Sequence, residues 1–212
     1  MSVVIIDGIS GSGKSRLLVG LQRLAQQRTP TYTKLFLTEH MTERFFERVN
    51  PSIPEVHAHV ARLLRVVAEM EAIRAAGPFA QHDRILTMTL ERLFLTLMSR
   101  GLMTMDFFAE EGELISATRM RHIFLMIPQG LIKDRIARSL LHRTKAWVDY
   151  VESLGGLTGA VTHFATQQEV MAEANARLPN TIERMTLEVS ELTNLDDETL
   201  LEGLLWSHRS LS

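Results

Sequence analysis

Residues 8–15 read Gly8-Ile9-Ser10-Gly11-Ser12-Gly13-Lys14-Ser15 and fit the pattern G-x-x-x-x-G-K-S without a mismatch. The apolar, β-branched run at residues 3–6 precedes this stretch and is typical of a buried parallel strand. Leucines at helical spacing follow it, between residues 17 and 24. The stretch therefore lies between a predicted strand and a predicted helix, which favours a phosphate-binding loop over a chance match.

The chemistry of this loop follows from its residue types. Its glycines allow the backbone to curl with several N–H groups pointing inward. These donors and the positive end of the following helix together favour phosphate oxygens. We expect Lys14 to reach the outer phosphates and Ser15 to offer its hydroxyl to Mg²⁺. The predicted nucleotide-binding residues are Gly8, Ser10, Gly11, Ser12, Gly13, Lys14 and Ser15.

The composition of the chain narrows the class of protein. Its 212 residues, 45% of them hydrophobic and 23% charged, suit one α/β domain with a sizeable core. The net charge of −2 gives no overall attraction to nucleic acid or to an anionic membrane. The absence of cysteine excludes disulfides and thiolate metal sites. With no apolar run near the roughly 18 residues of a membrane span, and no room for a signal peptide, we expect a soluble cytoplasmic protein.

Predicted strands and helices alternate along the chain. The strands fall at residues 3–6, 32–37, 79–82, 122–127 and 185–190. The main helices fall at residues 16–28, 55–76, 85–99, 131–145, 160–177 and 196–207. Residues 102–121 have no clear pattern, and core packing is their default interpretation. This order predicts an α/β fold of three layers with a mostly parallel five-stranded sheet, as a single domain over residues 1–212.

An acidic residue, Glu39, follows the second predicted strand. Ligands of open α/β sheets bind at the carboxyl ends of the strands, so this carboxylate would face the phosphate-binding loop. Glu39 is therefore a candidate general base. The alternative is an acid at a helix N-terminus, where the helix dipole favours negative charge.

The pair Asp83-Arg84 follows the third predicted strand and precedes the helix predicted at residues 85–99. Asp83 could bind Mg²⁺ directly or through water, and Arg84 could hold a phosphate. The alternative is a surface ion pair at the start of that helix. Leucines 86, 90, 93 and 97 recur at helical spacing and are expected on its core face.

A basic helix follows the fourth predicted strand and Pro128-Gln129-Gly130. Its cations are Lys133, Arg135, Arg138, Arg143 and Lys145. Arginines placed over a transferring phosphoryl group would stabilise the charge that develops on it. We predict a movable lid at about residues 130–160, with the glycines at 155, 156 and 159 helping its movement. The alternative is a solvent-exposed surface helix of alternating charge, which would contain the same number of basic residues.

Two absences bear on the kind of phosphate chemistry. The pattern D-x-x-G does not occur, and Asn194-Leu195-Asp196 lacks the lysine of the N-K-x-D guanine pattern. Both absences count against a GTPase. No predicted apolar strand ends in the Asp-Glu pair that many ATPases use. A kinase needs only a phosphate-binding loop, an acid near the acceptor hydroxyl and a basic lid.

Four places in the chain resemble the thymidylate kinase and deoxynucleoside kinase group of P-loop kinases. They are Asp7-Gly8 at the start of the loop, Glu39, the acid-arginine pair Asp83-Arg84, and the strand, proline and arginine-rich helix at residues 123–138. This resemblance covers most of the chain up to the last strand and helix. It implies that Glu39 activates the acceptor hydroxyl and that the arginine-rich helix leads into a lid.

The leading hypothesis is a kinase that depends on ATP and Mg²⁺ and phosphorylates a nucleoside or nucleotide. In this hypothesis Lys14, Glu39, Arg84 and Arg138 are catalytic, Arg135 and Arg143 help to hold the nucleotide, and Ser15 and Asp83 hold the metal. The sequence leaves open whether Glu39 or Asp83 is the base. It also leaves open the identity of the acceptor and whether the protein forms a homodimer. The alternatives are a kinase of a sugar or antibiotic, and a nucleotide-binding regulatory protein without acceptor chemistry.

Overall fold

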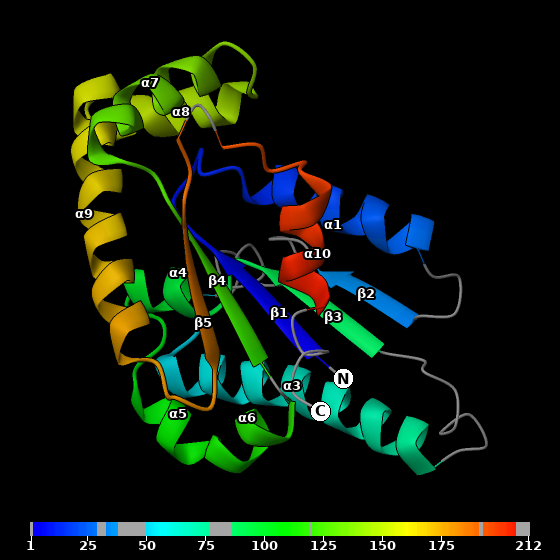
Figure 1. Cartoon of the computed structure of the whole chain (residues 1–212). Coiled ribbons are helices and arrows are strands. Elements are labelled where there is room, and N and C mark those ends of the chain that lie inside the picture. The colour runs from blue at the N-terminus through cyan, green and yellow to red at the C-terminus, as the bar shows by residue number, and fades with distance from the viewer. Residues whose placement is uncertain are drawn as a thin grey trace.

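The structure is a computed structural model that describes residues 2–28, 33–37, 50–76, 86–118, 120–190 and 193–206. Its five strands form one sheet in the order β2-β3-β1-β4-β5, and every pairing is parallel (Figure 1). The strands are β1 Ser2–Asp7, β2 Thr33–Leu37, β3 Leu86–Glu91, β4 Met120–Met126 and β5 Glu183–Glu188. The predicted α/β fold with a parallel sheet between helices is confirmed.

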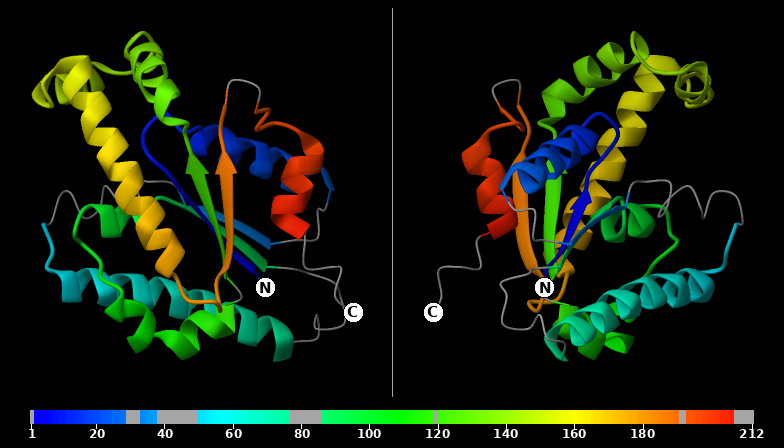
Figure 2. Two further views of the ribbon diagram at one scale, coloured as in Figure 1. Left: turned by 60° about the vertical axis from the view of Figure 1, so that its left-hand side comes forward. Right: turned by 90° about the vertical axis from the view of Figure 1, so that its right-hand side faces the viewer.

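Helices lie on both faces of this sheet, as Figure 2 shows. They are α1 Lys14–Arg28, α3 Ile53–Ala76, α4 Phe94–Ser99, α5 Asp106–Glu110, α6 Gly112–Thr118, α7 Gln129–Leu140, α8 Lys145–Ser153, α9 Gly156–Arg177 and α10 Glu198–Trp206. None of these helices, within the described ranges, is long and apolar enough to cross a membrane.

The alternation of side chains along β1 divides the core in two. Val3 and Ile5 pack with α3, α4 and α9 on one face of the sheet. Val4 and Ile6 pack with α1 and α10 on the other. All four side chains are at most 1% exposed, and each such burial stabilises the fold by about 1.5–3 kcal/mol. Both faces of the central strand are therefore apolar, as a buried parallel strand requires.

The prediction of one helix over residues 85–99 is wrong. Residues 86–91 form β3, which pairs with β1 and β2, and only residues 94–99 are helical. The leucines repeat every three or four residues, but Met88 and Leu90 also alternate with Thr89 and Glu91 in the period of a strand. The strand period prevails because Met88 and Leu90 join the core on the α3 face. The strand predicted at residues 79–82 lies outside the described residues.

The prediction of one basic helix over residues 131–145 is also wrong, because α7 ends at Leu140 and Lys145 begins a separate helix, α8. Most of the remaining elements lie close to their predicted positions. α1 ends at Arg28, and β2, α3 and β4 match within about two residues. β5 begins two residues before its predicted start. The unassigned segment contains α5 and α6, whose Phe107 and Ile115 are fully buried, so its core interpretation is confirmed.

A capping box sets the start of the long helix α3. Glu55 accepts hydrogen bonds from the backbone N–H and the hydroxyl of Ser52, at 2.7 and 2.8 Å. These bonds lower the pKa of the Glu55 carboxyl below its ordinary value. This start needs no contact from the rest of the fold, because the sequence Ser52-Ile53-Pro54-Glu55 supplies the cap, and a proline in the first turn, locally.

A buried arginine joins the last helix to the sheet. Arg121 of β4 is 2% exposed and donates to the carbonyl oxygens of Gly203, at 3.2 Å, and Leu204. It also pairs with Glu183 of β5 at 2.8 Å. The carbonyls at the C-terminal end of α10 lack partners within the helix, so this guanidinium satisfies two of them.

Candidate nucleotide and phosphoryl-transfer site

The predicted phosphate-binding loop, residues 8–13, leaves the carboxyl end of the central strand β1 and enters α1. Gly13 has φ +91°, a conformation that side chains disfavour. A Cβ there would lie 2.6 Å from Leu195, and a Cβ at Gly8 would lie 2.6 Å from the carbonyl oxygen of Leu125. The loop is therefore packed against its neighbours at positions that only glycine can occupy.

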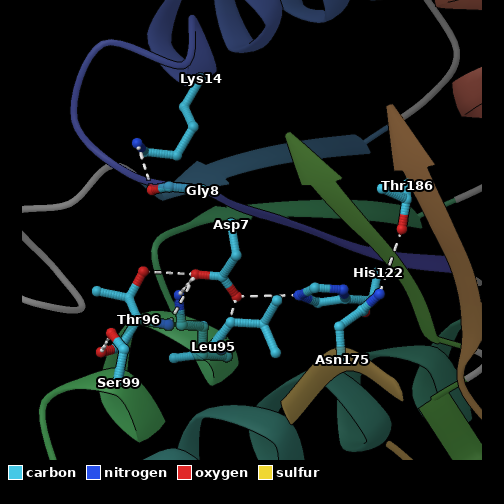
Figure 3. A network of polar contacts seen from close by, with 10 residues as sticks. Asp7, Gly8, Lys14, Leu95, Thr96, Ser99, His122, Asn175 and Thr186 are labelled. Carbon is cyan, nitrogen blue, oxygen red and sulfur yellow. Dashed lines mark hydrogen bonds and ion pairs between the residues drawn. The ribbon is translucent and has the colours of Figure 1, made fainter. Parts of the chain in front are cut away.

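Lys14 is folded onto the loop (Figure 3). Its ammonium donates to the carbonyl oxygens of Gly8 and Ile9, both at 2.8 Å, and the residue is 3% exposed. This places the cation against the strand side of the loop. A bound phosphate would compete with these two carbonyls for its protons.

Two oxygens that could bind a metal lie at this edge, one from the first turn of α1, where Ser15 was predicted as a ligand, and one from the end of β3, which was not predicted. The Ser15 hydroxyl donates to Glu91 Oε1 at 3.1 Å. Glu91 is the last residue of β3, lies opposite Ile6 in the sheet and is 3% exposed. A hydroxyl and a carboxylate are the oxygen ligands that Mg²⁺ prefers, and this ion needs few protein ligands when substrate phosphates supply the others.

Arg92 follows Glu91 in a left-handed backbone conformation, with φ 57°. Its N–H donates to the carbonyl oxygen of Ile6 at 2.9 Å, and its guanidinium reaches the Ser10 hydroxyl of the loop at 3.5 Å. A non-glycine residue in this conformation costs about 1–3 kcal/mol, and such strain is concentrated at functional sites. This backbone conformation directs the positively charged side chain of Arg92 toward the loop.

Arg135 of α7 approaches the loop from the other side of β1. Its guanidinium donates to the carbonyl oxygen of Ser190 at 2.9 Å. A Cβ on Gly11 would lie 3.6 Å from the Arg135 Cβ, which is ordinary contact. β3 and β4 are the two neighbours of β1, so the residues that follow them bring one arginine to each side of the loop.

The other two predicted lid arginines lie farther along the helical arm, which we define as α7, residues 141–144 and α8. Arg138 is exposed one turn beyond Arg135. Arg143 stacks on Trp147, with its Cζ 4.4 Å from the ring centroid. Figure 2 shows the arm continuing from the carboxyl end of β4. Of the three arginines, the structure brings Arg135 to the loop.

Residues 193–197, which precede α10, form a segment that lies against the loop and α1. Leu195 packs so closely on Gly13 that its Cδ1 would lie 2.6 Å from any Cβ at that position. Asp196 accepts from Arg16 Nε at 2.7 Å. Arg16 follows Ser15 directly, so this segment borders the first turn of α1. It closes the side of the site opposite β3.

The carboxylate of Asp7 lies directly behind the loop on the α4 face of the sheet, fully buried beside His122. Burial alone would raise the pKa of Asp7. The hydrogen bond and charge of His122, together with donors from Thr96 and Leu95, instead hold the pKa below its ordinary value. Asp7 is therefore an anion inside the core.

Comparison with known proteins gives a distant structural likeness. No family model matches the sequence, and no curated protein matches it. A solved structure from Chloroflexus aurantiacus J-10-fl, described as a "putative kinase", is similar with a TM-score of 0.46 and 13% identity. The similarity covers 100% of this chain and 97% of that chain. Function is therefore inferred from the geometry of the site.

Three predicted site residues, Glu39, Asp83 and Arg84, lie outside the described residues, and their roles stay predictions. The acid and arginine at the end of the described third strand are Glu91 and Arg92 instead. Sequence reasoning missed them because it placed residues 85–99 in one helix. The signal was present, since the alternating run at residues 87–90 ends directly at this pair.

Proposed function

We propose that the protein is a kinase that transfers the terminal phosphoryl group of Mg²⁺-bound ATP to the hydroxyl of a small molecule. The observation that carries this proposal is the 3.1 Å contact between Ser15 and Glu91 beside the buried Lys14. It brings a hydroxyl, a carboxylate and an ammonium to one edge of the sheet. These are the groups that phosphoryl transfer requires for the metal and the donor phosphates.

On the donor side, Lys14 would leave the carbonyls of Gly8 and Ile9 to pair with the outer phosphates. Ser15 and Glu91 would hold Mg²⁺, which neutralises negative charge on those phosphates when it is bound. The loop N–H groups would bind the remaining phosphate oxygens. Each role uses a group that already lies at or beside the loop.

The two flanking arginines favour transfer over binding alone. Arg92 and Arg135 approach the loop after β3 and β4 respectively. An arginine supplied by the same chain stabilises the charge that spreads over the transferring group, and such residues raise turnover strongly in related chemistry. A protein that only bound nucleotide would gain little from strain at Arg92.

For the acceptor, we propose a nucleoside or nucleotide. The support is the resemblance of Asp7-Gly8, Glu39 and residues 123–138 to the thymidylate kinase and deoxynucleoside kinase group. In this proposal Glu39, which follows β2, takes or orients the proton of the acceptor hydroxyl. Glu39→Gln should then lower turnover far more than it lowers the affinity for ATP.

The test is ADP release by the purified full-length chain with ATP and Mg²⁺ and a panel of nucleosides, nucleotides, sugars and aminoglycosides. We expect a nucleoside or nucleotide to raise ADP release at least tenfold over the rate without acceptor. Omission of Mg²⁺ is the control and should abolish the increase. Stimulation by a sugar or aminoglycoside would mean that the acceptor is not a nucleoside or nucleotide. Tight ATP binding without any stimulation would indicate a regulatory protein.

A further inference from the structure

We propose that Asp7 is a positioning residue that joins the phosphate-binding loop to the β3–α4 turn, residues 91–96, with His122 as its buried partner. The turn begins with Glu91 and Arg92, so Asp7 would set where the metal-binding carboxylate and the flanking arginine lie relative to the loop. The roles of Glu91 and Arg92 rest on the proposed function, whereas the mechanical connection through Asp7 does not.

The carboxylate of Asp7 is fully engaged by groups from two other elements (Figure 3). Its Oδ1 accepts from Leu93 N at 3.0 Å, from Thr96 N at 3.3 Å and from the Thr96 hydroxyl at 2.6 Å. Its Oδ2 accepts from Leu95 N at 3.0 Å and lies 3.0 Å from His122 Nε2. These contacts use the roughly four lone-pair sites of a carboxylate, so no room is left for another role.

The contacts attach the turn to β1 at two successive residues. The carbonyl oxygen of Ile6 accepts from Arg92 N at 2.9 Å, and the side chain of Asp7 then holds residues 93–96. Gly8, whose carbonyl oxygen accepts from Lys14, follows at once. A shift of the Asp7 carboxylate would therefore move the loop and the turn relative to each other.

Asp7 also does what a local residue usually does for a helix. The residue before α4, Leu93, provides no side-chain cap, and the first N–H groups of α4 are satisfied from β1 instead. A local cap would hold α4 alone. A cap from another strand holds α4 and fixes it to the start of the phosphate-binding loop as well.

His122 completes the arrangement from β4. Both Asp7 and His122 are 0% exposed. Within the described part of the chain, His122 Nδ1 has no hydrogen-bond partner, so the ring is held through the contact of its Nε2 with Asp7. Since an ionised carboxylate can only accept, the ring donates to Asp7 through Nε2, and the connection reaches β4, the strand that leads into α7.

The test is amide hydrogen exchange of the ligand-free, full-length Asp7→Asn variant. The asparagine keeps the shape but replaces one acceptor oxygen with an NH₂ group, which cannot accept from Leu95 N–H. We expect exchange to accelerate at least tenfold in both residues 8–15 and residues 91–96. The matched control is Val67→Ala, which removes buried apolar volume on α3 without removing a hydrogen bond of the Asp7 network and should accelerate neither segment selectively.

A binding measurement links the role of Asp7 to the proposed function. Wild type and Asp7→Asn are titrated with a non-hydrolysable ATP analogue, with and without Mg²⁺. We expect the gain in affinity from Mg²⁺ to fall at least tenfold in the variant, while the Mg²⁺-free affinity changes less than threefold. If the wild type binds no nucleotide, the proposed function is wrong, and the exchange result alone decides the role of Asp7.

If Asp7→Asn does not fold, His122→Gln serves as the second variant, because it removes one of the contacts and leaves the backbone donors in place. We expect the same two segments to exchange faster, by a smaller factor. Acceleration of residues 91–96 without residues 8–15 would make Asp7 only a cap of α4. Uniform acceleration, as in Val67→Ala, would likewise overturn the proposal.

Discussion

The phosphate-binding loop and the helical arm are held in opposite ways. At the loop, contacts join residues far apart in sequence, such as Ser15 with Glu91, 76 residues away. In the arm beyond Arg135 the contacts are local: Lys145 pairs with Asp149 four residues on, and Trp147 donates to Ser139 eight residues back. Lys14 is 3% exposed, whereas Leu141 of the arm is 76% exposed.

This difference separates a fixed half of the site from an adjustable half. The arm is connected to the loop region through Arg135, and α9, which follows the arm, is anchored by Gln168. The Gln168 amide accepts from Ile127 N at 2.8 Å and donates to Ile127 O at 2.7 Å. Changes at the loop should therefore cost more activity than changes in the arm.

The largest effect is expected from Lys14→Ala. Loss of the ammonium removes the cation nearest the outer phosphates, so phosphoryl transfer should fall about a thousandfold. ADP release measures the loss, and circular dichroism checks that the fold survives. The control is Lys145→Ala, an exposed arm lysine, which should retain wild-type turnover. Full activity of Lys14→Ala would remove the basis for the kinase proposal.

The next largest effect is expected from Glu91→Gln. The amide cannot supply a charged oxygen to Mg²⁺, so turnover should fall about 10- to 100-fold and the Mg²⁺ concentration for half-maximal rate should rise. Titration of the rate with Mg²⁺ measures both. The exposed Glu188 at the end of β5 provides the control variant Glu188→Gln. An unchanged Mg²⁺ dependence would mean that Glu91 only orients Ser15.

A smaller effect is expected in the arm, where Arg135→Ala should lower kcat/KM about tenfold. Arg143→Ala should lower it less than threefold, because that guanidinium lies on Trp147 rather than at the loop. The loss of kcat/KM in Arg138→Ala should lie between these two losses. Steady-state kinetics on all three measures the order. A larger loss for Arg143→Ala would show that the arm closes much farther over the loop.

Low pH should destabilise the folded protein through protonation of Asp7. Its pKa is lower in the folded chain than its ordinary value of 3.8, so its contribution to stability is complete above that value and is lost as the pH falls through the folded pKa. The difference in unfolding free energy between wild type and Asp7→Asn should therefore be constant from pH 7 to about 5 and narrow below about 4. Urea unfolding at each pH measures it. A difference that grows in acid would contradict this sign.

The smallest effect is expected at the capping box of α3. Ser52→Ala removes the hydroxyl hydrogen bond to Glu55 at a solvent-exposed helix start and leaves the backbone bond, so Tm should fall by about 2–4 °C with turnover unchanged. Differential scanning calorimetry measures the shift. Ser116→Ala on the exposed face of α6 is the control. A loss of turnover in Ser52→Ala would mean that α3 contributes to the site.

Local patterns were enough to predict much of the fold. The run at residues 3–6, the loop and the following leucines each predict their local structure from a few adjacent residues. The parallel direction of the strands follows from their alternation with helices. β3 was missed because two periods overlap in residues 86–99. Only the sheet decides between them, since Met88 and Leu90 gain burial against α3 as a strand.

The site was less predictable than the fold. The loop was found because its residues are contiguous, but Glu91 meets Ser15 only once β3 pairs beside β1. Asp7 was noticed for its position before Gly8, yet its partner His122 is 115 residues away. Contacts at such separations depend on strand order, which a single sequence does not state.

Arg121 has a consequence for how the chain folds as it is synthesised. Its partner Gly203 follows 82 residues later. At about 5–20 residues per second, a ribosome adds Gly203 about 4–16 s after Arg121. During that interval the guanidinium cannot be buried against the carbonyls of α10, and burial without them would be costly. The β4–β5 side of the sheet should therefore stay open on the ribosome until the last helix emerges.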